Sequence, residues 1–171
     1  VTISNTTYAG TKLMYSDWTV NGALEITTGN HLNNYDNTAT YYDIECKGNW
    51  TNAGIFTHNS QGTVTFNAAT DVNIDNGTST FQNVVFGDDA GGAATYYLTA
   101  ASTNIRLTMD INEDAVLDLN SNTLILGYNV GAGKVYTVSG TLEVDADATL
   151  AFDNRSSVCT LTVDNAGTPA L

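Results

Sequence analysis

Apolar and polar residues alternate along most of this chain, in short stretches. Apolar side chains stand at every second position in pairs such as Trp18/Val20, Leu24/Ile26. The same spacing recurs at Ile44/Cys46, Val64/Phe66, Val72/Ile74, Ile105/Leu107/Met109/Ile111, Leu117/Leu119, Leu124/Leu126, Leu142/Val144, Leu150/Phe152 and Leu161/Val163. Period-two alternation predicts β-strands with one buried face, and no segment keeps helical i, i+3, i+4 apolar spacing beyond about two turns. The sequence therefore predicts an all-β protein.

One phrase of this pattern is written twice. Residues 19–26 (TVNGALEI) return as residues 137–144 (TVSGTLEV), and in both copies the glutamate, Glu25 or Glu143, is expected to face outward between two inward apolar residues. Recurrence of one strand–turn–strand unit favours a solenoid, in which each strand meets the same partners in the next rung. The single proline, Pro169, also favours stacked strands with few free edges. A β-sandwich remains the alternative.

Four longer phrases carry a resemblance to a known family. They are residues 48–56 (GNWTNAGIF), 62–67 (GTVTFN), 80–86 (TFQNVVF) and 117–127 (LDLNSNTLILG). In their sequences and in their order along the chain, these segments resemble the β-strand repeats of large secreted bacterial and archaeal surface proteins. The resemblance covers about residues 18–165. The resemblance implies a right-handed parallel β-helix from an adhesin-like protein.

The expected domain organisation is simple. Residues 1–171 are expected to form one β-solenoid domain, or a segment of a longer repeat array. Residues 28–47 and 87–104 depart from the repeated pattern, because they are rich in Tyr, Ala or Asn. They are expected to form lateral loops, where contact specificity would reside.

Charge excludes several classes of partner. The formal net charge is -13, from 5 Lys+Arg against 18 Asp+Glu. No basic patch exists to bind nucleic acid or an anionic membrane surface, and no apolar run approaches the ~20 residues of a membrane span. An acidic surface rich in Thr and Asn favours an extracellular or cell-surface location. The start at Val1 is interpreted as a mature secreted product or a piece of a larger protein.

Paired carboxylates are the main candidates for catalysis, because parallel β-helices host many polysaccharide lyases and hydrolases. The pairs close in sequence are Asp88/Asp89, Glu113/Asp114 and Asp145/Asp147. Hydrolysis needs two carboxylates about 5–9.5 Å apart, one of them with a raised pKa. Asp145 and Asp147 are expected to alternate on a strand and face outward, as solvated strand residues also do. Neither His31 nor His58, in polar turn-like contexts, has zinc-ligand spacing, and we predict that the chain is not an enzyme.

Oxygen ligands for calcium occur in two places. Asp110, Asn112 and Asp114 lie in one expected loop, and Asp145 and Asp147 lie in another. Hard cations take such oxygen ligands, so a structural calcium ion is the one cofactor that the sequence suggests. Neither EF-hand spacing nor the glycine-rich nonapeptide of calcium-binding β-rolls is present.

Aromatic residues offer a surface for stacking sugars or another partner. Tyr41, Tyr42, Trp50, Tyr96 and Tyr97 are the candidates. The competing interpretation, which we favour, is packing in the core or on a strand face. In each Tyr-Tyr pair one ring must point outward if the segment is a strand, and the outward rings are the better candidates for extracellular glycans.

Cys46 and Cys159 test the solenoid interpretation. In a plain solenoid they lie about five rungs, or about 24 Å, apart, whereas a disulfide needs Cα atoms within about 7 Å. A bond between them within one chain would mean that the terminal segments fold back.

The two ends of the chain suggest its function. Val1 and Ile3 begin as a strand, Leu161 and Val163 still alternate as one, and neither end has an amphipathic cap. Uncapped solenoid ends invite head-to-tail contact between copies of the chain. The leading hypothesis is a non-catalytic extracellular structural protein, either a self-assembling surface fibre subunit or a segment of an adhesin stalk. The alternatives are a polysaccharide lyase or hydrolase and a carbohydrate-binding module.

Overall fold

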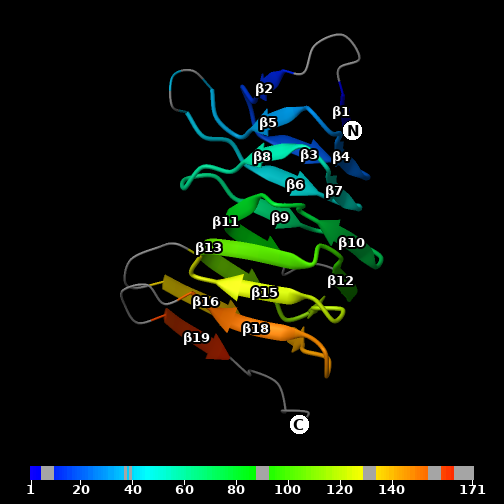
Figure 1. The fold of residues 1–171 in the computed structure, drawn as a ribbon, viewed down its shortest axis with the longest axis vertical. Coiled ribbons are helices and arrows are strands. Elements are labelled where there is room, and N and C mark those ends of the chain that lie inside the picture. Colours follow the sequence, from blue (N-terminus) through cyan, green and yellow to red (C-terminus); the bar gives the residue numbers. More distant parts are fainter. Residues whose placement is uncertain are drawn as a thin grey trace.

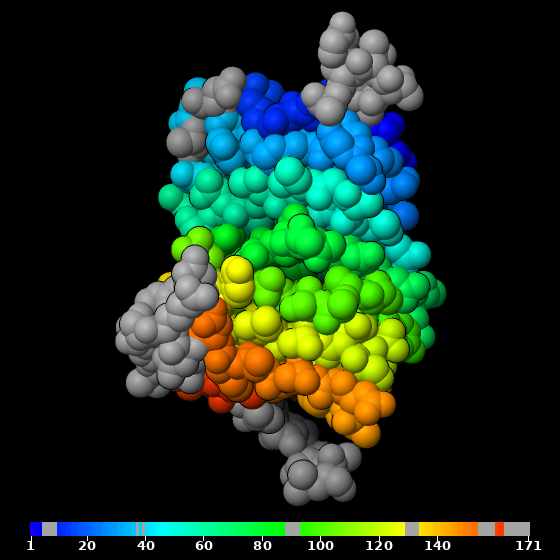
Figure 2. Space-filling model, viewed as in Figure 1, coloured from blue at the N-terminus to red at the C-terminus, as the bar shows by residue number. Residues whose placement is uncertain are grey.

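The chain is a parallel β-solenoid. The computed structural model describes residues 1–4, 10–36, 38, 40–87, 93–128, 134–153 and 159–163. These residues form 19 strands and no helix, wound into about six turns (Figure 1). Successive parts of the chain form successive layers along the long axis (Figure 2). Pairing between strands in the described residues is parallel throughout, which confirms the all-β solenoid and excludes the antiparallel β-sandwich. Those residues contain no helix that could cross a membrane.

The first face of the solenoid is a seven-stranded sheet. Its strands, in spatial order, are β1 (Thr2–Ile3), β4 (Leu24–Ile26), β7 (Trp50–Asn52), β10 (Val72–Asp75), β12 (Ala94–Leu98), β14 (Ala115–Asp118) and β17 (Thr141–Glu143). β1 and β17 are the terminal strands of this sheet, at opposite ends of the molecule (Figure 1).

The second and third faces are separate at the N-terminal end. The second face starts as a three-stranded sheet of β2 (Thr11–Leu13), β5 (His31–Asn33) and β8 (Ile55–Thr57). The third starts with β3 (Trp18–Val20), β6 (Ile44–Cys46) and β9 (Val64–Phe66). Each rung at this end therefore has three short strands separated by two bends.

The two faces merge in the middle of the solenoid. There β11 (Thr80–Phe86) and β13 (Ser102–Ile111) each run through both faces as one long strand. They separate again because the first part of β13 pairs with β15 (Thr123–Leu126) and the last part with β16 (Lys134–Val138). β18 (Thr149–Phe152) then pairs with β15, and β19 (Cys159–Val163) with β16. The register between β11 and β13 shifts between Phe81 and Asn83, where a bulge replaces the bend of the other rungs.

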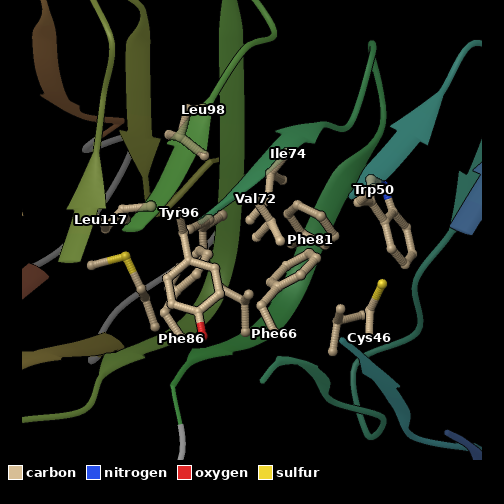
Figure 3. Close-up of a cluster of buried hydrophobic side chains, with 14 of the residues drawn as sticks. Cys46, Trp50, Phe66, Val72, Ile74, Phe81, Phe86, Tyr96, Leu98 and Leu117 are labelled. Carbon is tan, nitrogen blue, oxygen red and sulfur yellow. The ribbon is translucent and has the colours of Figure 1, made fainter. Parts of the chain in front are cut away.

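The core consists of columns of inward side chains, one residue from each rung. On the third face one column contains Val20, Cys46, Phe66, Phe86, Ile111 and Val138, each in register with the next. Aromatic rings fill the centre, where the Phe66 and Phe86 rings are stacked at 5.5 Å and the Trp50 ring lies edge-on to Phe66 at 5.8 Å (Figure 3). Burial of such rings is the main stabilisation available to rungs with so few residues per strand.

The repeated phrase occupies the same corner in both copies. Each copy leaves the third face (β3 or β16), turns at its glycine, and enters the first face (β4 or β17). The rungs stack tightly at this corner. A Cβ on Gly48, one rung after Gly22, would lie 2.6 Å from the Gly22 carbonyl carbon, so glycine is required there. Glu25 and Glu143 are exposed, as predicted.

Both segments in which we predicted lateral loops also contribute to the rungs. Residues 28–47 contain β5 and β6, and residues 34–43 connect them. Residues 87–104 contain β12 and the first residues of β13, and residues 88–92, with the carboxylate pair Asp88/Asp89, lie outside the described part.

The cysteines lie at opposite ends of the third face. Cys46 is a buried free thiol on β6, and burial raises its pKa. Cys159 begins β19, which is separated from β6 by β9, β11, β13 and β16. At about 4.8 Å per strand the backbones are about 24 Å apart, so the structure excludes a disulfide between them within one chain.

Candidate functional site

The residues predicted to bind calcium lie at two different corners of the solenoid. Asp110 and Asn112 precede the turn from β13 to β14, and the Asn112 side-chain amide donates to the Gly87 carbonyl at 3.0 Å. Asp145 and Asp147 lie in the turn from β17 to β18, at a different corner. They are exposed turn residues, so the prediction that they alternate on a strand is wrong, because β17 ends at Glu143. Across the described residues, no group of three or more His, Cys, Asp or Glu side chains could hold a metal ion.

Two of the five candidate aromatic contacts are core residues. Trp50 and Tyr96 are 0% and 1% exposed and lie between the sheets (Figure 3). Trp50 Nε1 donates to the Asn76 side-chain oxygen at 3.1 Å, and the Tyr96 hydroxyl accepts from Ala68 N at 3.2 Å. As surface contacts these two assignments are wrong, because the favoured alternative of core packing applies to them.

The other three aromatic candidates do not form one platform. Tyr97 faces outward from β12 on the first face, in register with Asn73 and Asp118. Tyr41 and Tyr42 lie in the connection between β5 and β6, and neither belongs to a strand. The Tyr41 ring lies 6.4 Å from the Tyr35 ring, and both are half-buried.

A buried carboxylate organises that connection. Asp36 accepts hydrogen bonds from Thr38 Oγ1 at 2.7 Å, from the backbone N–H groups of Thr38 and Thr40 at 2.8 and 3.0 Å, and from the Tyr42 hydroxyl at 3.0 Å. These bonds, that of the Thr38 side chain first, lower the pKa of Asp36 to about 2. Burial and the adjacent Asp36 raise the pKa of Tyr42. The Tyr42 hydroxyl therefore forms a hydrogen bond within the protein, to Asp36.

The C-terminal end of the solenoid exposes its core. Leu126 is 0% exposed, but its partner in the last rung, Phe152, is 43% exposed. Leu142 is likewise more exposed than its partner, because it is only partly buried whereas Leu117 is fully buried. Val144, the residue that follows β17, is 47% exposed. The last described rung therefore presents apolar side chains that an adjoining rung would cover.

The N-terminal end is better closed but has a hollow. Ile3 and Val20 are 8% and 3% exposed. Beside them is a depression of about 380 Å³ lined by Val1, Asp17, Trp18, Thr19 and Val20. Three of these lining residues, Trp18, Thr19 and Val20, form β3, which is the terminal strand of its sheet among the described residues. The residues predicted for assembly thus lie at opposite ends, with Val1 and Ile3 here.

The second face ends differently. Lys12 on β2 is in register with Leu32 and hence with Phe56, which are both buried. Lys12 itself is exposed. A charged residue at an inward position of an edge strand opposes pairing of that edge. The first and third faces are therefore the better surfaces for strand addition, and Leu161 and Val163 lie on β19 of the third face.

Val144 and Phe152 are exposed apolar residues that were not predicted to lie on a contact surface. Both were identified as inward strand residues, and their exposure follows only from their place in the last described rung. The available signal was the alternation at Leu142/Val144 and Leu150/Phe152, which continues without a cap up to Val163.

Comparison of the chain with models of known protein families, with curated proteins and with solved structures finds no match. The fold is therefore assigned from the strand pairing alone. Membership of the adhesin-like surface proteins stays a prediction from the resemblance of the repeated phrases.

Proposed function

We propose that this chain is a non-catalytic, extracellular structural protein that extends by stacking of solenoid ends. The observation that carries the proposal is the uncovered core in the last described rung, where Phe152 is 43% exposed although its partner Leu126 is fully buried, and where Val144 is 47% exposed. Apolar surface of this kind is stabilised when another rung covers it, by about 25 cal/mol per Å².

Strand addition supplies the geometry of the contact. β17 and β19 end the first and third faces at one end, and β1 and β3 end them at the other. Main-chain groups of an edge strand pair readily with an added strand. Because the two ends differ, the contact is head-to-tail and propagates into a filament. The adjoining rung belongs to a second copy in a fibre, or to further repeats in an adhesin stalk.

A location outside the cell fits the surface of the protein. With a net charge of -13 and few lysines or arginines, the solenoid repels polyanions and stays solvated. The outward positions of the third face include Thr19, Thr65, Thr137 and Thr162, which hydrate without charge. Extracellular location stays a prediction from composition and from the resemblance.

The proposal is tested by the assembly state of two matched variants. Val144→Glu places a charge on the exposed apolar end, and Ile55→Glu places the same charge on the second face, where Ile55 is 56% exposed. We expect ordered head-to-tail filaments of the unchanged chain in electron microscopy. Val144→Glu should abolish them, and Ile55→Glu should leave them intact.

The contrary results are distinct. Strictly monomeric particles of the unchanged chain at high concentration would remove the proposal of self-assembly. Equal loss of filaments in both variants would show that the contact is lateral. Circular dichroism provides the control, because both substitutions are at exposed positions and should leave the strand content unchanged.

A second candidate function rests on the connection between β5 and β6. The Tyr35 and Tyr41 rings are half-buried there, next to the loop that Asp36 holds in place. Such a fixed aromatic pair suits stacking against a sugar, as in a carbohydrate-binding module. Binding on a glycan array that is lost in Tyr41→Ala and kept in Tyr15→Ala, at an exposed tyrosine elsewhere, would favour it. An activity screen on polysaccharides tests the lyase or hydrolase alternative.

A further inference from the structure

The repeated corner contains an unusual chemical difference between its two copies. The first reads Asn21-Gly22, and the second reads Ser139-Gly140. An asparagine followed by glycine is prone to lose its side-chain amide, because glycine leaves its own backbone nitrogen open to attack the asparagine Cγ. The chain has two such pairs, Asn21-Gly22 and Asn76-Gly77.

The second pair, Asn76-Gly77, is locked against this reaction. Asn76 is 0% exposed, its side-chain oxygen accepts from Trp50 Nε1 at 3.1 Å, and its side-chain nitrogen donates to the Ser79 carbonyl at 3.0 Å. The attacking group, Gly77 N, donates to Asp75 Oδ1 at 2.8 Å. Neither the electrophile nor the nucleophile is free to move.

The first pair, Asn21-Gly22, lacks these restraints. Asn21 is exposed, and the structure gives its side chain no hydrogen bond within the described residues. Gly22 N has no acceptor in the same part of the chain, and a Cβ built on Gly22 would meet nothing within 4 Å. Among the described residues β3 is the terminal strand of its sheet, so no described strand before it supplies a carbonyl group to Gly22 N.

In the second copy of the phrase, the preceding rung supplies a hydrogen-bond acceptor for the corner. There Ser139 N and Gly140 N both donate to the Ile111 carbonyl, at 2.8 and 3.0 Å. Gly140 is the counterpart of Gly22. A rung stacked before the first one would place a carbonyl group at the equivalent point and bind Gly22 N.

We propose that Asn21 is a spontaneous modification site, which deamidates while the first rung is uncovered and is protected when another rung stacks on it. Gly22 N forms a bond to Asn21 Cγ and loses its proton, and the side-chain nitrogen leaves as ammonia. Water then opens the cyclic imide at either carbonyl group and yields aspartate or isoaspartate. The protection, though not the modification itself, rests on the proposed stacking of ends.

The product weakens the end that carries it. Deamidation adds a negative charge to an acidic molecule, and isoaspartate also lengthens the backbone within the corner. Either change disturbs the corner between β3 and β4, on which an added rung would stack. Chains that stay unassembled are expected to lose the ability to be extended at this end.

Peptide mass spectrometry tests the proposal on the full chain during incubation in mildly alkaline buffer. In monomers we expect a gain of about 1 Da at Asn21, with isoaspartate, and none at Asn76. In filaments conversion should be about fivefold slower, the factor that one ordinary hydrogen bond supplies. Asn21→Ser, which copies the chain's own second phrase, should form filaments and stay unmodified. Asn21→Asp should form them less readily.

The outcomes separate the two proposals. Conversion at Asn21 no faster than at Asn76 in monomers would overturn the modification site, whatever the assembly state. Deamidation of Asn21 in a chain that never forms filaments would support the modification site. It would overturn the proposed stacking of solenoid ends. Filaments in which Asn21 converts as fast as in monomers would overturn the protection alone.

Discussion

At the scale of single residues, the environment of His58 in the structure differs from the one that its sequence context predicts. A polar, turn-like setting is expected for it, yet it is buried between the Phe56 and Phe81 rings. Its Nδ1 accepts from Gln82 N at 2.9 Å, so Nε2 carries the proton and donates to the Gly62 carbonyl at 2.9 Å. Gln82 comes from the next rung, which is why a local sequence window gives no sign of this role.

Burial of His58 predicts acid sensitivity. It lowers the pKa of His58 from 6.5 to about 4. The unfolded chain therefore binds the proton first, so the free energy of unfolding falls as the pH drops from 6.5 towards 4, by about 3 kcal/mol. Urea unfolding across this range measures the slope. His58→Gln should flatten it, and an unchanged slope in His58→Gln would contradict the assignment.

At the scale of elements, the strands could be predicted from the sequence and the corners could not. Inward pairs such as Leu24/Ile26 and Val64/Phe66 mark strands that the structure contains. The alternation of apolar and polar residues does not show that β11 and β13 each pass through two faces. A bend and a bulge both leave the same order of inward and outward side chains along the sequence. The Asp36 loop was missed because its bonds come from residues outside any strand.

That loop gives a prediction of its own. Asp36→Ala leaves the Thr38 and Thr40 amides and the Tyr42 hydroxyl without their acceptor, so hydrogen exchange at both amides should become faster. The Asp36 pKa is lowered from 3.8 to about 2, so its contribution is present above about pH 4 and is lost as the pH falls through 2. Thr38→Val, which removes only the hydroxyl, should have the smaller effect. Equal exchange in Asp36→Ala and the unchanged chain would refute the role.

At the scale of the whole molecule, the sequence predicted the coil and the separation of its ends, but not which side chains the ends expose. The alternation at Val144 resembles that at Ile26, although one residue is 47% exposed and the other is buried. The difference lies in the number of neighbouring rungs, a property of position along the coil. Binding residues were harder still. Core packing was the favoured interpretation of the aromatic residues, but the sequence alone did not show that Trp50 and Tyr96 are the ones that lie in the core.

Charge predicts how the ends meet. Each molecule carries a net charge of -13, and exposed Glu143, Asp145 and Asp147 lie at the end that, in the proposed filament, approaches Asp17 of the next copy. Raising the salt from about 0.05 M to about 0.5 M shortens the screening length severalfold, so filament length measured by light scattering should increase. The apolar contact is not weakened by sodium chloride, because it carries no charge. Val144→Glu should stay monomeric throughout, and filaments that dissolve as salt rises would indicate an ionic contact in place of the apolar one.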